Sequence, residues 1–324
     1  MKKIVFNGFR HGHIDGLYRA VLKCPALEIA GCYEPDESAR SAASARLSAD
    51  ICADGYDEML AGTDIVAIGG RYGERGPAVI RALNAGKHVI ADKPVCTSMG
   101  ELFEIKRLCE EKHLSVICML DLRYTPAAIA AKQVLDSGLL GEVRNVSFNG
   151  QHCIDYGKRP TWYFEPGMHG GTVNDLAIHG IDLVRLLTGM DFAQTDAVRT
   201  WNAYATMHPY FKDCATLMAR LENGAGVLAD VSYSAPAGVS TLPSYWEFRF
   251  WCKRGMLSFH YTGNDVHVYL AGEKEVRVVP GVTSTQSWLT DLLDEIEQGD
   301  ISITRSMLAS AEQTLRLQVL ADRA

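Results

Sequence analysis

The first 120 residues alternate short apolar runs with helix-like segments, and this alternation constrains the fold more than any other feature of the chain. The runs are rich in apolar and β-branched residues, as is typical of strands that are buried on both faces of a parallel sheet. They are Lys3–Phe6, Glu28–Cys32, Asp64–Ile68, His88–Ile90 and Ser115–Met119. Because consecutive parallel strands need crossover connections, usually helices, the pattern predicts a doubly wound α/β sheet.

The segments between the runs carry helix start and stop signals. Ser98 and Glu101 have the spacing of a capping box, which predicts a helix from about Ser98 towards Glu111. Pro77 and Gly86 follow the proline-first, glycine-last order that is typical of the two ends of a helix. We therefore expect helices to cover this sheet.

After Met119 the strands arrive in pairs, some of them separated by turn dipeptides such as Asn223-Gly224 and Arg254-Gly255. The expected strands are Val143–Gln151, Ala197–Ala203, Ala215–Leu221, Ala225–Ser232, Trp246–Cys252, Met256–Tyr261 and His267–Leu270. The expected helices are Ala127–Ser137, Thr172–Leu187, Gln286–Gln298 and Arg305–Asp322. The sequence thus predicts a first domain over residues 1–121. A C-terminal α+β domain with a large, mostly antiparallel open sheet is expected over residues 122–324, and its terminal helix could pack back on the first domain.

Composition and charge exclude several classes of protein. Hydrophobic residues make up 47% of the chain and charged residues 22%, which is ordinary for a globular protein. The net charge is -7 and no run of lysines and arginines is present, so a nucleic-acid partner is not expected. The N-terminal apolar run stops at Asn7, and we expect neither a signal peptide nor a membrane span. Nine scattered cysteines without a C-x-x-C pair favour reduced thiols and a cytoplasmic location.

The turn after the first run has the place and size of a dinucleotide-binding turn, in which backbone N–H groups approach a pyrophosphate. Its residues are Gly8, Phe9, Arg10, His11, Gly12 and His13. The turn departs from G-x-G-x-x-G because Arg10 stands at the middle glycine position. Arg10 could instead donate charge-assisted hydrogen bonds to a phosphate. An ordinary glycine-bearing loop is the alternative interpretation.

Glu34 lies just after the second run, about twenty residues past the turn, where an acidic side chain can accept hydrogen bonds from the adenine ribose hydroxyls. A carboxylate there would repel a ribose phosphate, so we expect NAD as the cofactor. Arg40 leaves NADP open, and a solvated strand-end carboxylate is the alternative interpretation of Glu34.

Two segments carry specific residue patterns. Residues 85–94 read Ala-Gly-Lys-His-Val-Ile-Ala-Asp-Lys-Pro, and residues 170–182 follow the pattern G-G-x-x-x-D-x-x-x-H-x-x-D through Asp175, His179 and Asp182. Both segments resemble the glucose-fructose oxidoreductase, inositol dehydrogenase and MocA (Gfo/Idh/MocA) family, whose first motif is A-G-K-H-V-x-x-E-K-P, so that Asp92 stands in place of its glutamate. The resemblance implies a Rossmann domain, hydride transfer between a nicotinamide and a secondary alcohol of a sugar or polyol, and a homodimer or homotetramer formed through the C-terminal sheet.

The second segment also supports acid–base chemistry by its spacing. Residues four apart on a helix share a face, which predicts that Asp175 lies one turn before His179 with Asp182 beside them. A histidine can take a hydroxyl proton while a carboxylate holds its ring. Without the resemblance, a structural histidine on a solvated acidic stripe is the alternative.

Lys93 follows the fourth run, at the sheet edge where doubly wound folds bind ligands. The resemblance implies that Lys93 polarises the reacting C–O group, that Asp92, Lys93 and Pro94 border the cofactor, and that Asp175 and His179 act on the same alcohol. It also suggests a cis Lys93–Pro94 bond.

Aromatic and basic residues around the two motifs are candidates for binding a polyhydroxylated substrate. They are Arg123, Tyr124, His152, Tyr156, Trp162, Tyr163 and His169. No spacing demands a metal, although Asp175, His179 and His169 could form a site, so we expect none. Two other functions stay open, an NAD-dependent glycosidase with transient redox chemistry and a non-catalytic dinucleotide-dependent sensor.

Overall fold

The computed structural model describes residues 1–239 and 241–323 and divides into two compact units. The first unit contains Met1–Met119, Gly167–Gly170 and Gln286–Glu312. The second contains Leu120–Pro166, Gly171–Thr285 and the residues from Gln313 on. The predicted boundary between residues 121 and 122 remains a prediction.

The first unit is built on a parallel sheet of five strands in the order β2-β1-β3-β4-β5. The strands are β1 (Lys2–Asn7), β2 (Leu27–Tyr33), β3 (Ile65–Ile68), β4 (His88–Ala91) and β5 (Val116–Cys118). Each overlaps a predicted run, and β3 is buried along its whole length. The chain crosses from β2 on one side of β1 to β3 on the other, so a topological switch point lies between β1 and β3, where such folds bind ligands.

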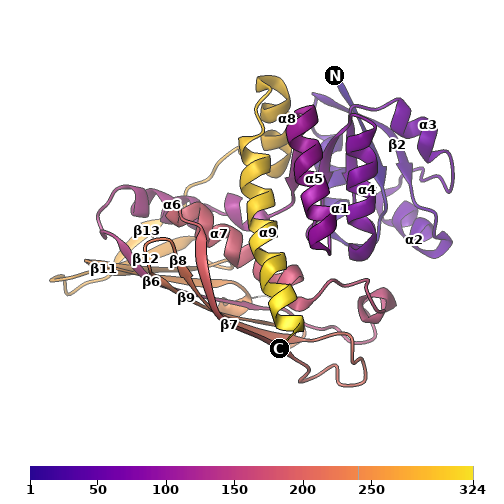
Figure 1. The fold of residues 1–324 in the computed structure, drawn as a ribbon. Helices are drawn as coiled ribbons and strands as arrows, with labels where there is room; N and C mark the ends of the chain where they lie inside the picture. Colours follow the sequence, from indigo (N-terminus) through magenta and orange to yellow (C-terminus); the bar gives the residue numbers. More distant parts are fainter. Residues whose placement is uncertain (240, 324) are drawn as a thin grey trace. The chain divides into compact units, whose positions relative to one another are not determined.

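Helices cover this sheet, and Figure 1 shows α4 and α5 alongside each other. The helices of the unit are α1 (His13–Leu22), α2 (Glu37–Leu47), α3 (Tyr56–Ala61), α4 (Tyr72–Asn84), α5 (Met99–Lys112), α8 (Trp288–Gln298) and the first half of α9 (Ser302–Asp322). Ser98 caps α5 by accepting a hydrogen bond from the Glu101 N–H, as predicted. The Glu101 carboxylate accepts from the Thr97 N–H rather than from Ser98, so the capping box is only half formed.

One helix start was predicted wrongly. Helix α4 begins at Tyr72, so Pro77 lies inside the helix and not at its start. Tyr72, Arg75 and Val79 are completely buried along one face of α4. Helical stability in proteins comes mainly from such packing, which here outweighs the missing proline N–H.

The second unit is built on an eight-stranded sheet in the order β13-β12-β11-β10-β6-β9-β8-β7. Its strands are β6 (Val143–Gln151), β7 (Phe192–Trp201), β8 (Cys214–Leu221), β9 (Gly226–Ser232), β10 (Glu247–Cys252), β11 (Gly255–His260), β12 (Asp265–Leu270) and β13 (Arg277–Pro280). Only β6 and β9 pair in parallel among these strands, so the prediction of a large, mostly antiparallel sheet is confirmed. Strand β13 and the first half of β7 were not predicted.

Two helices, α6 (Pro126–Asp136) and α7 (Ile178–Thr188), contact each other over one face of this sheet (Figure 1). Helix α7 packs closely on β6 at Gly180, where a Cβ would overlap the Phe148 ring. Before α7 the chain forms a π-helical turn, η3 (Val173–Ala177), where the sequence predicted a regular α-helix. The Gln318 side-chain oxygen accepts hydrogen bonds from the N–H groups of Val173 and Asn174 at the start of this turn.

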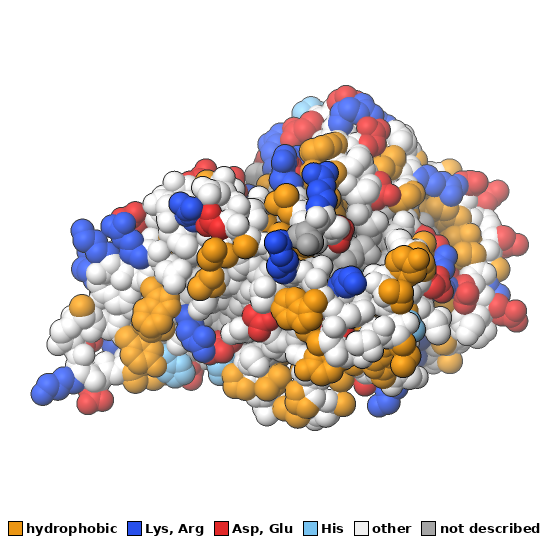
Figure 2. Space-filling view, turned by 60° about the horizontal axis from the view of Figure 1, so that its bottom comes forward, with side chains coloured by type: hydrophobic (Ala, Val, Ile, Leu, Met, Phe, Trp, Pro, Cys, Tyr) orange, Lys and Arg blue, Asp and Glu red, His pale blue; other side chains and the backbone are white. Residues whose placement is uncertain are grey.

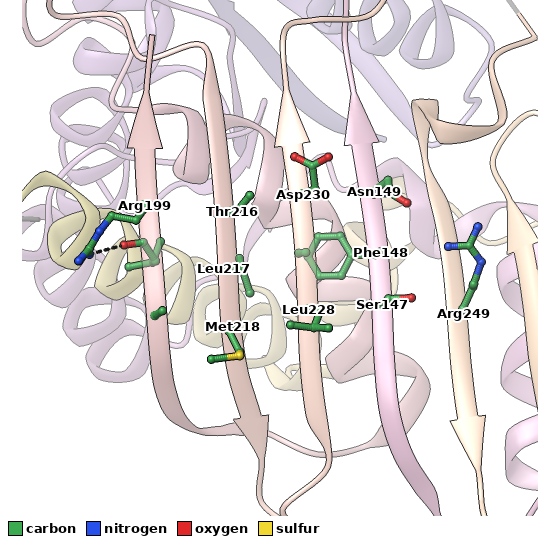
Figure 3. A pocket seen from close by; sticks show the side chains of 13 residues that line it. Ser147, Phe148, Asn149, Arg199, Thr216, Leu217, Met218, Leu228, Asp230 and Arg249 are labelled. Carbon is green, nitrogen blue, oxygen red and sulfur yellow. Dashed lines mark hydrogen bonds between the residues drawn. The ribbon is translucent and has the colours of Figure 1, made fainter. Parts of the chain in front are cut away.

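Large apolar side chains are exposed on the eight-stranded sheet. Met218 on β8 and Leu228 on β9 are register partners that lie side by side in Figure 3, and each is more than two-fifths exposed. They border a shallow hollow of about 400 Å³, whose rim carries Asp230 and Arg249. Figure 2 shows groups of hydrophobic side chains between charged ones on the face that it presents.

No helix among the described residues combines the length and the hydropathy that a transmembrane segment requires. All nine cysteines are free thiols.

Candidate active site

The turn between β1 and α1 is shaped by one glycine rather than two. Gly8 has a φ of +89°, and a Cβ there would lie 2.6 Å from the Gly70 nitrogen in the loop after β3. The Arg10 N–H donates to the Gly69 carbonyl over 2.8 Å. Gly12 has an ordinary helical conformation and open space where a Cβ would stand. The turn therefore needs glycine at position 8 and lies against the β3 loop at the switch point.

Arg10, at the middle glycine position, ties the turn to the end of β2. Its Nη1 lies 3.2 Å from Glu34 Oε1 and 3.2 Å from Asp36 Oδ2. Arg10 thus pairs with two carboxylates of the protein, and its predicted contact with a phosphate remains a prediction.

Glu34 stands at the predicted place, but its carboxylate is engaged by the protein. Oε2 accepts from the Phe9 N–H at 2.9 Å, and Oε1 accepts from Arg10 and from the Asp36 N–H at 3.1 Å. The side chain is 2% exposed. The alternative of a solvated carboxylate is wrong, because Glu34 holds the non-glycine turn in shape.

A cavity of about 450 Å³ opens beside this turn, within the usual size range of small-molecule sites. It is lined by Asn7, Gly8, Arg10, Tyr33, Glu34, Pro35, Asp36, Tyr56, Ile68, Gly70, Arg71, Glu74, Pro77, Ala78 and Arg81. A close-packed glycine, carboxylates after β2 and apolar side chains between them fit the adenosine half of a dinucleotide. The residues of this unit therefore fit the cofactor that the sequence predicts.

Asp92 is the hub of a second cluster at the end of β4. It is completely buried and accepts from His11 Nδ1 at 2.7 Å, His13 Nδ1 at 2.9 Å, Arg75 Nη2 at 2.7 Å and the Lys93 N–H at 2.7 Å. Burial alone raises the pKa of Asp92, but the charges of Arg75 and the two imidazoles hold this pKa well below its usual range. Burial also lowers the pKa of His11 to about 4.

His11, His13 and Asp92 offer three metal-ligand atoms within 4.8 Å of one another, a group that differs from the set considered in the sequence. The fixed positive charge of Arg75 on the same carboxylate opposes a divalent cation there. The histidine pair was missed as a partner of Asp92, although the H-x-H spacing and the shortened acid were both visible.

Lys93 follows β4 as predicted, is 3% exposed, and precedes a cis peptide bond to Pro94, which confirms that expectation. Its carbonyl accepts a hydrogen bond from Arg75, and its Nζ lies 5.9 Å from the centre of the Tyr72 ring. The rings of His11 and His169 each lie 5.7 Å from that of Tyr72. Tyr72 thus contacts three predicted site residues, Lys93, His11 and His169. The sequence analysis did not identify Tyr72.

In the second unit, Asp175 lies in the π-helical turn and His179 in the first turn of α7. Both side chains are nearly buried. The buried Tyr233 hydroxyl donates to Asp175 Oδ2, and burial together with that carboxylate raises the pKa of Tyr233. His179 meets the Trp246 ring edge-on at 5.4 Å. The regular helical spacing assumed for Asp175 and His179 is therefore wrong.

Arg123 and Asp182 form a bidentate ion pair, with Nε to Oδ2 at 2.6 Å and Nη2 to Oδ1 at 2.5 Å. This pair joins the 3₁₀ turn η1 (Asp121–Tyr124) to α7. Asp182 thus supports Arg123, a role that the expected acidic row beside His179 did not include.

The remaining candidate substrate residues of this unit divide into buried and exposed groups. His152 stacks on Tyr245 at 4.6 Å and meets Trp246 at 5.7 Å, so His152 and His179 contact the same indole. Trp162 and Tyr163 are buried against each other. Tyr156 is 43% exposed and stacks on Phe164, and Tyr124 is half-buried in η1.

Two models of one protein family match this chain. Residues 8–120 match the oxidoreductase family with an NAD-binding Rossmann fold, and residues 128–258 match the GFO/IDH/MocA C-terminal domain. The chain belongs to the GFO/IDH/MocA family. Its first matched segment is an NAD-binding Rossmann domain, as the motifs predicted.

Individual GFO/IDH/MocA relatives match shorter stretches. A levoglucosan dehydrogenase from Pseudarthrobacter phenanthrenivorans is 31% identical over 127 residues, which are 38% of this chain and 32% of that protein. The alignments span about a third to a half of the length of the first curated relatives.

Solved structures match over nearly the whole chain. A putative oxidoreductase from Erwinia carotovora atroseptica has a TM-score of 0.88 at 20% identity, with 99% of each chain covered. An oxidoreductase from Agrobacterium radiobacter, solved with NAD+, L-tartaric acid and magnesium, has a TM-score of 0.80 at 20% identity, covering 99% of this chain and 95% of that one. At this level of identity these matches show the GFO/IDH/MocA fold.

Proposed function

We propose that this protein transfers hydride between NAD and a secondary alcohol of a sugar, a polyol or a related small molecule. The observation that carries the proposal is the placement of Lys93. It follows β4 of an NAD-binding domain, with its backbone held by Arg75 and Asp92. A buried ammonium at the ligand-binding edge of a doubly wound sheet is suited to stabilise charge on a substrate oxygen.

The remaining roles follow from the chemistry of the residues. NAD, when bound, supplies the hydride acceptor or donor. The Gly8–His13 turn, with Glu34 and Asp92 bracing it, would hold the dinucleotide. His179 would take the hydroxyl proton, Asp175 would support the imidazolium that forms, and Lys93 would donate to the oxygen.

A hydroxylated ring is the substrate class that the second unit favours. His179, the proposed base, lies against Trp246, which also contacts His152. Aromatic rings of this kind provide apolar faces with polar edges, which suit the two faces of a sugar ring. The levoglucosan dehydrogenase relative acts on a compound of that class by its name.

The test is to incubate the purified protein with NAD or NADP and each member of a panel of polyols, sugar acids and free sugars. Activity is measured from the absorbance of the reduced nicotinamide. We expect Lys93→Ala to lower kcat about 10²–10⁴-fold, because it removes charge stabilisation at the reacting oxygen. Lys274→Ala, a change at an exposed lysine after β12, is the matched control. Wild-type activity in Lys93→Ala would exclude the role of the lysine, and glycoside cleavage without net NADH would favour the glycosidase.

We also propose that the open face of the eight-stranded sheet pairs with a second copy of the chain. Exposed Met218, Leu228 and Trp251 support this, because soluble monomers seldom leave such apolar surface uncovered. Leu228→Asp would place a charge in that interface, and sedimentation should then show smaller particles than for the wild type. An unchanged particle mass would rule out this surface as the interface.

A further inference from the structure

Two carboxylates follow β2 at the rim of the cofactor cavity, and they differ in what they can offer a ligand. Glu34 and Asp36 both line the cavity. The Glu34 side chain is 2% exposed, whereas the Asp36 side chain is 45% exposed. The sequence pointed to Glu34, which has the usual spacing from the turn.

Glu34 is committed to the turn. Its two oxygens accept three hydrogen bonds, from the Phe9 N–H, Arg10 and the Asp36 N–H. Because these oxygens are almost completely buried, a movement that exposed them to a ribose would take the acceptor away from the N–H of Phe9, a buried residue, and a buried unsatisfied donor is unfavourable. Glu34 is therefore suited to fix the turn and poorly suited to distinguish a ribose hydroxyl from a ribose phosphate in the cavity.

Asp36 has the opposite character. Its Oδ1 accepts from the Ala39 N–H at 2.8 Å and so caps α2, while its Oδ2 lies 3.2 Å from Arg10 Nη1. Each carboxylate oxygen can accept a second hydrogen bond. The hydrogen bond from Ala39 and the charge of Arg10 keep the pKa of Asp36 below its usual value, so the group is anionic at neutral pH.

The cations that line the cavity already have acidic partners. Arg10 bridges Glu34 and Asp36, Arg71 pairs with Glu74, and Arg81 pairs with Asp57. A ribose phosphate would compete with these carboxylates for every guanidinium, whereas a ribose diol needs only an acceptor.

We infer that Asp36, rather than Glu34, is the residue that selects NAD over NADP in this chain. The inference rests on the proposed function, in which this cavity holds the adenosine end of the dinucleotide. Asp36 would accept a hydrogen bond from a ribose hydroxyl and repel a phosphate at the same position.

The test is the Kd of NAD and of NADP, measured by calorimetry on the intact protein. The variants are Asp36→Asn and Asp36→Ser, which remove the charge but keep a good helix N-cap, and Glu34→Gln as the comparison. We expect both Asp36 variants to shift the NADP-to-NAD affinity ratio about tenfold towards NADP, since a like-charge contact is relieved. Glu34→Gln should weaken both cofactors by similar factors, because it loosens the shared turn.

Two results would overturn the inference. One is an affinity ratio within twofold of the wild type in both Asp36 variants while their thermal unfolding is unchanged. The other is a larger shift of the ratio in Glu34→Gln than in Asp36→Asn. Either result leaves the proposed hydride transfer intact, whereas failure of the wild type to bind either dinucleotide would overturn both.

Discussion

At the scale of single residues, the departures from the family pattern form two separate groups of contacts. The turn after β1 carries Arg10, His11 and His13 where a glycine-rich turn has little side chain, and Asp92 replaces a glutamate. Arg10 bonds Glu34, and both histidines bond Asp92. The shorter acid leaves room for two imidazoles, and the imidazoles supply donors that the turn backbone alone does not. His11, His13 and Asp92 are therefore best understood as one coupled unit.

This coupling predicts that the family's usual residue is unfavourable here. Asp92→Glu adds a methylene to a completely buried site that already holds four donors, and overpacking of this kind lowers stability by about 1–3 kcal/mol. Asp92→Asn should lower it further, by about 3–5 kcal/mol, because the buried Arg75 loses its counter-charge. Urea unfolding measures both values. A neutral effect of Asp92→Glu would mean that the histidines do not limit the size of the acid.

At the scale of elements, the sequence predicts strands better than it predicts helix starts. Lys93 and Glu34 were placed at strand ends because short buried runs bounded by turns are local signals. The start of α4 at Tyr72 was missed because tertiary burial, not a local cap, decides it. The π-helical turn around Asp175 was missed for the same reason, since its first donors are satisfied by Gln318, far along the chain. Tyr72 and Tyr233 entered the site through contacts that no spacing in the sequence reveals.

The π-helical turn depends on a tyrosine from a neighbouring strand end. Tyr233→Phe removes the hydroxyl that donates to the nearly buried Asp175, so we expect a loss of stability of about 1–3 kcal/mol. We also expect the acidic limb of the kcat–pH profile to move to higher pH, because Asp175 loses a donor that favours its charged form. Tyr269→Phe, at an exposed position on β12, is the control. An unchanged profile with reduced stability would make Tyr233 purely structural.

At the scale of the whole molecule, the two units divide the work of the proposed reaction. The parallel sheet with the Gly8 turn and Lys93 is the NAD-binding half, and the chemistry assigned to His179 belongs to the half built on the antiparallel sheet. Fold class was predictable for both halves because strand spacing and turn dipeptides are repeated many times over the chain, so single errors do not change the outcome.

This division predicts that binding and turnover can be separated by mutation. NAD that binds only the native state stabilises it by about 2.7 kcal/mol at a concentration of 100 Kd. His179→Ala should keep that stabilisation, because the residue lies outside the NAD-binding unit, while kcat falls about 10²–10⁴-fold with loss of the base. Thermal unfolding with and without NAD, beside turnover of the same samples, measures both effects. If the variant lost the NAD-dependent stabilisation without losing the fold, His179 would be a cofactor-binding residue and the proton would need another acceptor.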